Sequence, residues 1–142
     1  MLPALSEIPG SLLFKGSLIA IVDDDQAVRD SLRRLMRSFG YPAEAFALAS
    51  DFLAFSRLDE TACLIADINM PAMTGLELYF RLVDTGHPIP TILITAYPDN
   101  AVQTRALSAG VVAYLQKPFD ESAIMHCVCT ALEPGNRRED NS

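Results

Sequence analysis

Five short apolar runs alternate with amphipathic segments along this chain, and the alternation limits the folds that it can adopt. The runs are typical of buried strands and cover residues 17–22, 43–46, 63–67, 90–96 and 111–115. Segments with helical spacing follow them at residues 28–39, 50–55, 75–83, 99–109 and 121–132. Every connection is long enough for a crossover, so consecutive strands can lie parallel. The pattern predicts an α/β fold, a parallel sheet with helices on both faces.

The length and composition fit one globular domain. The chain has 142 residues, of which half are apolar and one fifth are charged. We predict a folded domain over residues 17–132, a flexible N-terminal extension over 1–16 and a disordered polar tail over 133–142. No apolar run could span a bilayer and no signal peptide precedes the domain, so we expect a cytoplasmic protein without membrane contact.

Charge and cysteine content restrict the partners. The formal net charge of −7 argues against direct nucleic-acid binding by this domain, because phosphate contacts need a basic face. The same charge is compatible with a carboxylate cluster that binds a cation, or with a solvated acidic surface. Cys63, Cys127 and Cys129 are interpreted as buried free thiols in a reducing compartment.

Polar residues on the helical segments have ordinary structural interpretations. Asp25 is expected to begin the first helix, and Ser50 can cap the second. The polar face of the first helix forms either a solvated surface or a docking surface for an acidic partner, and it carries Arg29, Arg33, Arg34 and Arg37.

The third apolar run ends at a carboxylate, Asp67, and Pro71 follows four residues later. A run without polar alternation indicates a strand that is covered on both faces, as in a parallel sheet. Ligands of open α/β sheets bind at the carboxyl ends of the strands. Asp67 is therefore the candidate for a reactive or metal-ligating group.

Three other predicted strands also end in polar residues. Asp23 and Asp24 follow the first run, Thr95 belongs to the end of the fourth, and Lys117 follows the fifth. Carboxylates gathered at one edge would repel one another unless a hard divalent cation such as Mg²⁺ bound there. An acid cluster, a metal, a hydroxyl and an ammonium group together suit phosphoryl transfer. Asp67 would be the nucleophile and form an acyl phosphate.

The order of these motifs resembles the response-regulator receiver domain, in wording closest to the FixJ-like branch. The matching motifs are VDDD at 22–25, DINMPAMTG at 67–75, ITA at 94–96 and KPF at 117–119. The resemblance implies a CheY-like, doubly wound flavodoxin fold of five (βα) units with strand order 2-1-3-4-5. It also implies a signalling protein whose only catalysis is its own phosphorylation and dephosphorylation.

The resemblance implies a role for each site residue. Asp67 would accept a phosphoryl group from a sensor histidine kinase. Mg²⁺ or Mn²⁺ would be ligated by the Asp24 and Asp67 side chains and the Asn69 backbone carbonyl, with Asp23 acting through water.

Further residues would bind and report the phosphoryl group. Lys117 would pair with it, Thr95 would hydrogen-bond one of its oxygens, and the backbone N–H groups of Asn69 and Ala96 would assist. Tyr114 matches the aromatic residue that turns inward when the threonine moves, although it could equally be strand packing. The Lys117–Pro118 bond is often cis in this family.

The output and two other functions stay open at this point. Phosphorylation would repack the face formed by residues 99–109, 111–115 and 121–132. That face would bind a downstream protein, an output domain of the same protein, or a second copy of the chain. A Mg²⁺-dependent phosphohydrolase is a competing interpretation, but such enzymes typically carry an acid where this chain has Asn69. A phosphate-independent binding module is the third.

Overall fold

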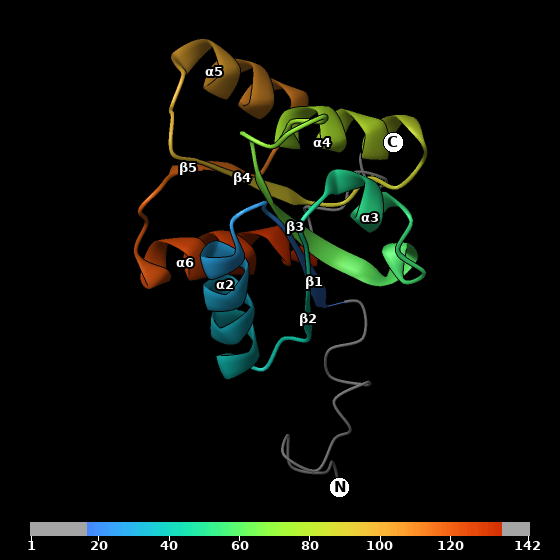
Figure 1. Ribbon diagram of the computed structural model, residues 1–142, viewed down its shortest axis with the longest axis vertical. Coiled ribbons are helices and arrows are strands. Elements are labelled where there is room, and N and C mark those ends of the chain that lie inside the picture. Colours follow the sequence, from blue (N-terminus) through green and yellow to red (C-terminus); the bar gives the residue numbers. More distant parts are fainter. Residues whose placement is uncertain (1–16, 135–142) are drawn as a thin grey trace, which may run out of the picture.

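The computed structural model describes residues 17–134 as a five-stranded sheet flanked by helices (Figure 1). The strands are β1 (Leu18–Val22), β2 (Ala43–Phe46), β3 (Thr61–Asp67), β4 (Thr91–Thr95) and β5 (Ala113–Gln116). The helices are α2 (Gln26–Ser38), α3 (Ala49–Leu53), α4 (Gly75–Asp84), α5 (Asn100–Ala109) and α6 (Glu121–Ala131), and η2 is a 3₁₀ turn (Leu58–Glu60). The predicted extension over 1–16 and the predicted tail from residue 135 onward lie outside the described residues.

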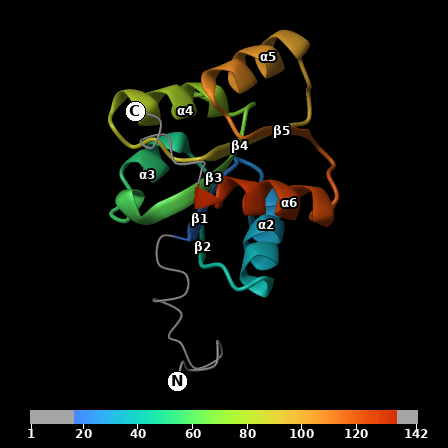
Figure 2. The same cartoon turned by 180° about the vertical axis from the view of Figure 1, so that it is seen from behind.

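All paired strands are parallel, and their order is β2-β1-β3-β4-β5. This confirms the predicted doubly wound α/β fold and its strand order. Helices α3, α4 and α5 cover one face of the sheet, and α2 and α6 cover the other (Figures 1 and 2). Every residue of β1, β3 and β4 is buried, as expected for strands covered on both sides.

Successive side chains of the central strands enter two separate cores. In β1, Ala20 and Val22 pack with α3 and α4, whereas Ile19 and Ile21 pack with α2 and α6. This alternation follows from the two-residue period of a strand. The sheet is therefore fixed from both faces, and its carboxyl edge is a firm platform for the side chains that follow it.

Local capping explains most helix boundaries. The Asp25 carboxylate accepts hydrogen bonds from the first turn of α2, which confirms its expected place at the helix start. Thr74 and Glu77 form a reciprocal capping box at α4. The Ser50 prediction is wrong, because α3 begins at Ala49 without a side-chain cap and Ser50 lies inside the helix. Ala49 is instead buried in the core on this face of the sheet.

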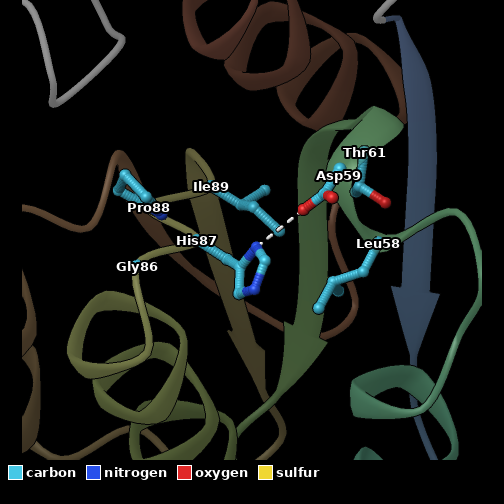
Figure 3. A pocket seen from close by; sticks show the side chains of 7 residues that line it. All are labelled: Leu58, Asp59, Thr61, Gly86, His87, Pro88 and Ile89. Carbon is cyan, nitrogen blue, oxygen red and sulfur yellow. Dashed lines mark ion pairs between the residues drawn. The ribbon is translucent and has the colours of Figure 1, made fainter.

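A pocket of about 300 Å³ lies at the amino edge of the sheet, between the start of β3 and the segment before β4 (Figure 3). His87 Nδ1 lies 2.8 Å from Asp59 Oδ1 across this pocket, and Thr61 and Ile89 line it. The pocket is at the opposite end of the strands from Asp67.

No helix within residues 17–134 is long and apolar enough to cross a membrane.

The cysteines differ in exposure, so the interpretation of all three as buried thiols is wrong for Cys129, and we expect different reactivity. Cys63 is fully buried in β3, where burial raises the pKa of its thiol, whereas Cys129 on α6 is exposed. Because the thiolate is the nucleophile, iodoacetamide should alkylate Cys129 in the native chain and reach Cys63 only in denaturant. Peptide mass mapping checks this, and alkylation of Cys63 at the native rate of Cys129 would contradict it.

Candidate functional site

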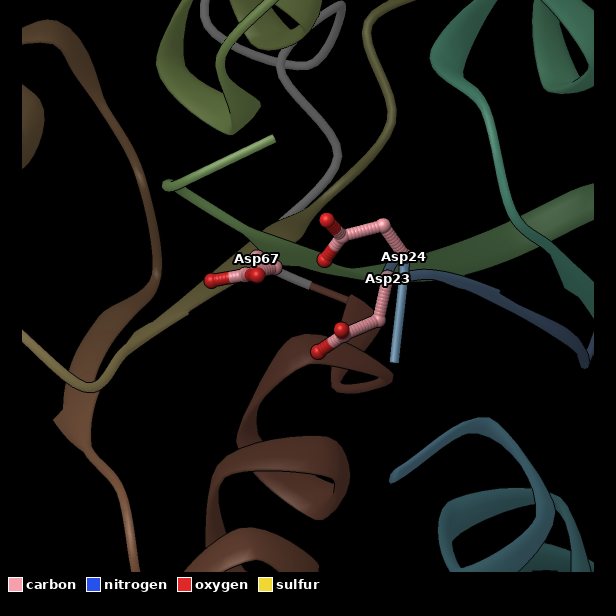
Figure 4. A group of neighbouring side chains, drawn as sticks. All are labelled: Asp23, Asp24 and Asp67. Atoms are coloured by element: carbon pink, nitrogen blue, oxygen red, sulfur yellow. The ribbon is translucent and has the colours of Figure 1, made fainter. Parts of the chain in front are cut away.

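Four strand ends deliver polar side chains to the carboxyl edge of the sheet. Asp23 directly follows β1, Asp67 ends β3, Thr95 ends β4 and Lys117 directly follows β5. One carboxylate oxygen from each of Asp23, Asp24 and Asp67 lies within 4.8 Å of the others (Figure 4). Asp23 and Asp67 are buried, and Asp24 is exposed. The structure thus brings together the groups that the sequence placed at separate strand ends.

Lys117 neutralises part of this acidic cluster. Its ammonium lies 2.9 Å from Asp23 Oδ2 and 3.6 Å from Asp67 Oδ2. Burial alone would lower the pKa of Lys117, but the hydrogen bond to Asp23 and the charges of Asp23 and Asp67 outweigh it and raise the pKa. One lysine faces three carboxylates, so the cluster keeps an excess of negative charge.

This excess acts on the Asp67 carboxyl group. Burial and the nearby charge of Asp23 raise its pKa, although the Asn69 backbone N–H and Lys117 act in the opposite direction. Asn69 N donates to Asp67 Oδ1 at 3.2 Å. The fold therefore disfavours the ionised form of Asp67, and a bound cation would stabilise that form.

The donor set suits a hard divalent cation. Three carboxylates offer only oxygen ligands, one of them is exposed to solvent, and Mg²⁺ and Mn²⁺ prefer oxygen donors and retain water ligands. Asp23, Asp24 and Asp67 could therefore hold such an ion, with the backbone carbonyl of Asn69 as a further candidate from the loop after β3.

The Thr95 hydroxyl is bonded on both its donor and its acceptor sides. It donates to Asn69 Oδ1 at 2.6 Å and accepts from the Tyr97 backbone N–H at 2.9 Å. Ala96 follows Thr95 and is exposed at the same edge. The sequence placed Thr95 near the acid cluster but gave no sign of its bond to the Asn69 side chain.

Tyr114 in β5 connects to the helix that follows β4. Its ring packs partly buried against the core on the α4 and α5 side of the sheet. Its hydroxyl accepts a hydrogen bond from the Asp99 backbone N–H at 2.9 Å, and Asp99 is the N-cap of α5. Tyr114 thus packs against the core and also contacts the start of α5.

Gly75 has a positioning role that sequence reasoning missed. A Cβ atom at this residue would lie 2.5 Å from the backbone oxygen of Asp67, a distance that real Cβ contacts do not show. The missing side chain lets the first turn of α4 pack directly on the end of β3. The requirement comes from a close approach between two elements, so no local sequence pattern reveals it. The loop between them holds Ala72 in a left-handed conformation with φ of 70°.

Arg29 also has a contact that the sequence did not predict. Its guanidinium donates to the backbone carbonyl of Asp23 at 2.8 Å, and its side chain is half-buried. Arg29 therefore holds the backbone directly after β1 at Asp23 and is not only a solvated charge on α2. The Lys117–Pro118 bond, on the other side of the site, is cis as the family resemblance implied.

A groove of about 610 Å³ borders the site between α2 and the 117–119 segment. Val28, Leu32 and Phe119 supply apolar walls, and Lys117 and Ala96 lie at the end next to the carboxylates.

The sequence pattern of the response regulator receiver domain matches residues 19–128. The chain belongs to this family. Receiver domains are signalling modules of two-component systems and not ordinary enzymes.

Relatives agree with this assignment. The response regulator TodT of Pseudomonas putida is 36% identical over 128 residues, which cover 90% of this chain and 56% of TodT. The transcriptional regulator FixJ of Rhizobium meliloti is 35% identical over 81% of this chain and 56% of its own length, which confirms a FixJ-like relationship. A structure of the response regulator StyR superposes with a TM-score of 0.78 at 38% identity, covering 87% of this chain and 62% of StyR. The chain spans just over half the length of the curated relatives that it matches.

The close approach at Gly75 predicts a position-specific effect of added volume. Gly75→Ala should destabilise the domain by about 1–3 kcal/mol in urea denaturation, because overpacking forces backbone shifts. It should also displace the backbone amide NMR signals of residues 67–69. Gly86→Ala is the control for the NMR signals: alanine at its φ of +84° would be strained, but the added Cβ would meet nothing within 4 Å, so the signals of residues 67–69 should stay in place. Unmoved signals in the Gly75→Ala variant would contradict the positioning role.

The raised pKa of Asp67 predicts that its charge weakens the metal-free fold. The folded chain binds this proton more tightly than the unfolded chain, so the stability contribution is full at low pH and is lost as pH rises through the raised pKa. At pH 7 in EDTA, Asp67→Asn should therefore melt higher than the wild type by about 2–8 °C for each kcal/mol relieved. The exposed Asp84→Asn should not change the melting temperature. An Asp67→Asn variant that melts lower at pH 7 would refute this cost.

Proposed function

We propose that this receiver accepts a phosphoryl group on Asp67 from the phosphohistidine of a sensor histidine kinase, with Mg²⁺ or Mn²⁺ bound. The observation that carries the proposal is the cluster of Asp23, Asp24 and Asp67 with Lys117 at a single sheet edge. Phosphoryl transfer depends mainly on positioning and on neutralising charge, and this edge combines both.

The reaction follows from the groups present. An Asp67 oxygen attacks the phosphorus, the P–N bond of the donor breaks, and the imidazole nitrogen keeps the electron pair. Asp23, Asp24, Asp67 and the Asn69 carbonyl would hold the metal ion, whose charge offsets the negative charge gathered there. Lys117 lies 3.6 Å from Asp67 and supplies the second positive charge to the phosphoryl oxygens.

Backbone and hydroxyl donors complete the binding of the phosphoryl group. The Asn69 N–H already points to Asp67 Oδ1 at 3.2 Å, so it is placed to donate to a group on that carboxylate. The Thr95 hydroxyl is at the end of the neighbouring strand β4, and the Ala96 N–H directly follows that strand. These donors stabilise the added negative charge with charge-assisted hydrogen bonds.

The phosphorylated state is read at the face formed by α5, β5 and α6. Thr95 bonds the Tyr97 backbone, and Tyr114 bonds the Asp99 backbone at the start of α5, so movement of Thr95 has a short route to this face. The repacked face binds a downstream protein, an output domain or a second phosphorylated copy. The receiver acts in the cytoplasm, and its acidic charge leaves nucleic-acid binding to other domains or partners.

A phosphohydrolase is disfavoured at the same site. The residue two positions after Asp67 is Asn69, whose carboxamide is bonded to Thr95 and has no titratable proton for general acid–base catalysis. Turnover of p-nitrophenyl phosphate by the purified chain would favour the hydrolase over the switch.

Acetyl phosphate tests the acceptor assignment directly. With Mg²⁺, the wild-type chain should gain the mass of one phosphoryl group, and EDTA should prevent the gain because the cluster is left without its cation. Asp67→Asn should gain no mass, whereas the exposed Asp84→Asn should behave as wild type. Intact-protein mass spectrometry checks all four samples. An equal mass gain in wild type and Asp67→Asn, or no mass gain in wild type, would contradict the proposal.

A further inference from the structure

Asn69 contacts two groups of the site with different parts of the residue. Its backbone N–H donates to Asp67 Oδ1, and its side-chain carbonyl accepts from the Thr95 hydroxyl at 2.6 Å. Asn69 follows β3 and Thr95 ends β4, so the side-chain bond joins two neighbouring strand ends. Both contacts are present in the structure.

The Thr95 hydroxyl has a single proton, and it donates this proton in a hydrogen bond to the Asn69 side chain. A hydroxyl donates one hydrogen bond and can accept two, and here it accepts one from the Tyr97 backbone. A phosphoryl group on Asp67 would present acceptor oxygens to Thr95. Thr95 can donate to the phosphoryl group only after its hydrogen bond to the side-chain oxygen of Asn69 breaks. The phosphoryl oxygens and Asn69 Oδ1 therefore compete for the same proton.

We propose that the Asn69 side chain is a positioning residue that holds Thr95 in the unphosphorylated arrangement, and that phosphorylation switches the domain by displacing it. The inference rests on the proposed function. It deepens that function by naming the contact that sets the threshold for switching. The exchange replaces a neutral hydrogen bond with a charge-assisted one, which gives it a direction.

The position of Thr95 affects more than its own side chain. Its oxygen holds the Tyr97 backbone at the start of the segment that leads into α5, and Asp99 in that segment is held by the Tyr114 hydroxyl at 2.9 Å. Release of Thr95 from Asn69 therefore changes a restraint on this segment. NMR signals of Thr95 and Tyr114 are the appropriate readout, because a merely structural role of Asn69 would not move them toward the switched state.

The first test needs no phosphorylation. In metal-free and phosphate-free buffer, Asn69→Ala should shift the Thr95 and Tyr114 signals part of the way toward their positions in beryllofluoride-loaded wild type. Asn69→Asp keeps an acceptor oxygen for Thr95 but adds a charge, so its Thr95 and Tyr114 signals should move less toward the beryllofluoride-loaded positions than those of Asn69→Ala. Asn100→Ala removes the same kind of amide from an exposed position on α5 and should leave the Thr95 signal in place. An unmoved Thr95 signal in Asn69→Ala would overturn the inference.

The second test measures the competition itself. With Mg²⁺, beryllofluoride, a mimic of the phosphoryl group, should bind Asn69→Ala about 3–10-fold more tightly than wild type, the range for removing one competing neutral hydrogen bond. Equal or weaker binding would count against the inference. The two proposals fail differently. A wild type that gains no mass from acetyl phosphate removes the proposed function, whereas a phosphorylated chain with an unmoved Thr95 signal in Asn69→Ala removes only the role of Asn69.

Discussion

The ion pair between Lys117 and Asp23 closes the carboxyl edge of the sheet across 94 residues of sequence. Asp23 is fully buried, and a buried carboxylate requires a partner because desolvation of an unpaired charge is costly. Lys117 supplies that partner and also lies near Asp67, so one ammonium fixes the loop after β5 against the ends of β1 and β3. The rest of the site keeps its acidic character because the Lys117 ammonium is already paired with Asp23.

The parallel sheet holds the backbone of the site residues in place. Asp67 and Thr95 end strands that are buried on both faces, and Asp23 directly follows another, so their backbone cannot move without disturbing one of two cores. Sites built on rigid elements hold their groups more accurately than sites built on loops alone. Arg29 adds a brace from α2 to the Asp23 carbonyl, and Asp25 N–H donates to Asp23 Oδ1 at 2.9 Å. Asp23 is thus held by its own loop and by the helix that follows it.

The sequence was sufficient for the parts of this site that depend on strand ends. Asp23, Asp67 and Thr95 could be placed together because apolar runs predict parallel strands, whose carboxyl ends share one edge. Contacts that depend on the approach of two elements or on one rotamer were not predictable, and these include the bond from Asn69 to Thr95 and the space at Gly75. The Ser50 prediction used the residue type alone, whereas the first residue of α3 is Ala49, which is buried in the core and has no side-chain cap before it.

Gly75 has a consequence for how this gene can change. Every single-nucleotide substitution that replaces a glycine codon's amino acid adds at least a Cβ atom, and here that atom meets the Asp67 backbone. No mutational step of that kind leads away from Gly75 without disturbing the acceptor. Ala72, three residues earlier, is in the reverse situation, since its left-handed backbone is one that glycine adopts without strain and an alanine codon lies one nucleotide from a glycine codon. The segment after Asp67 therefore combines Gly75, which does not tolerate substitution, with Ala72, where glycine is tolerated.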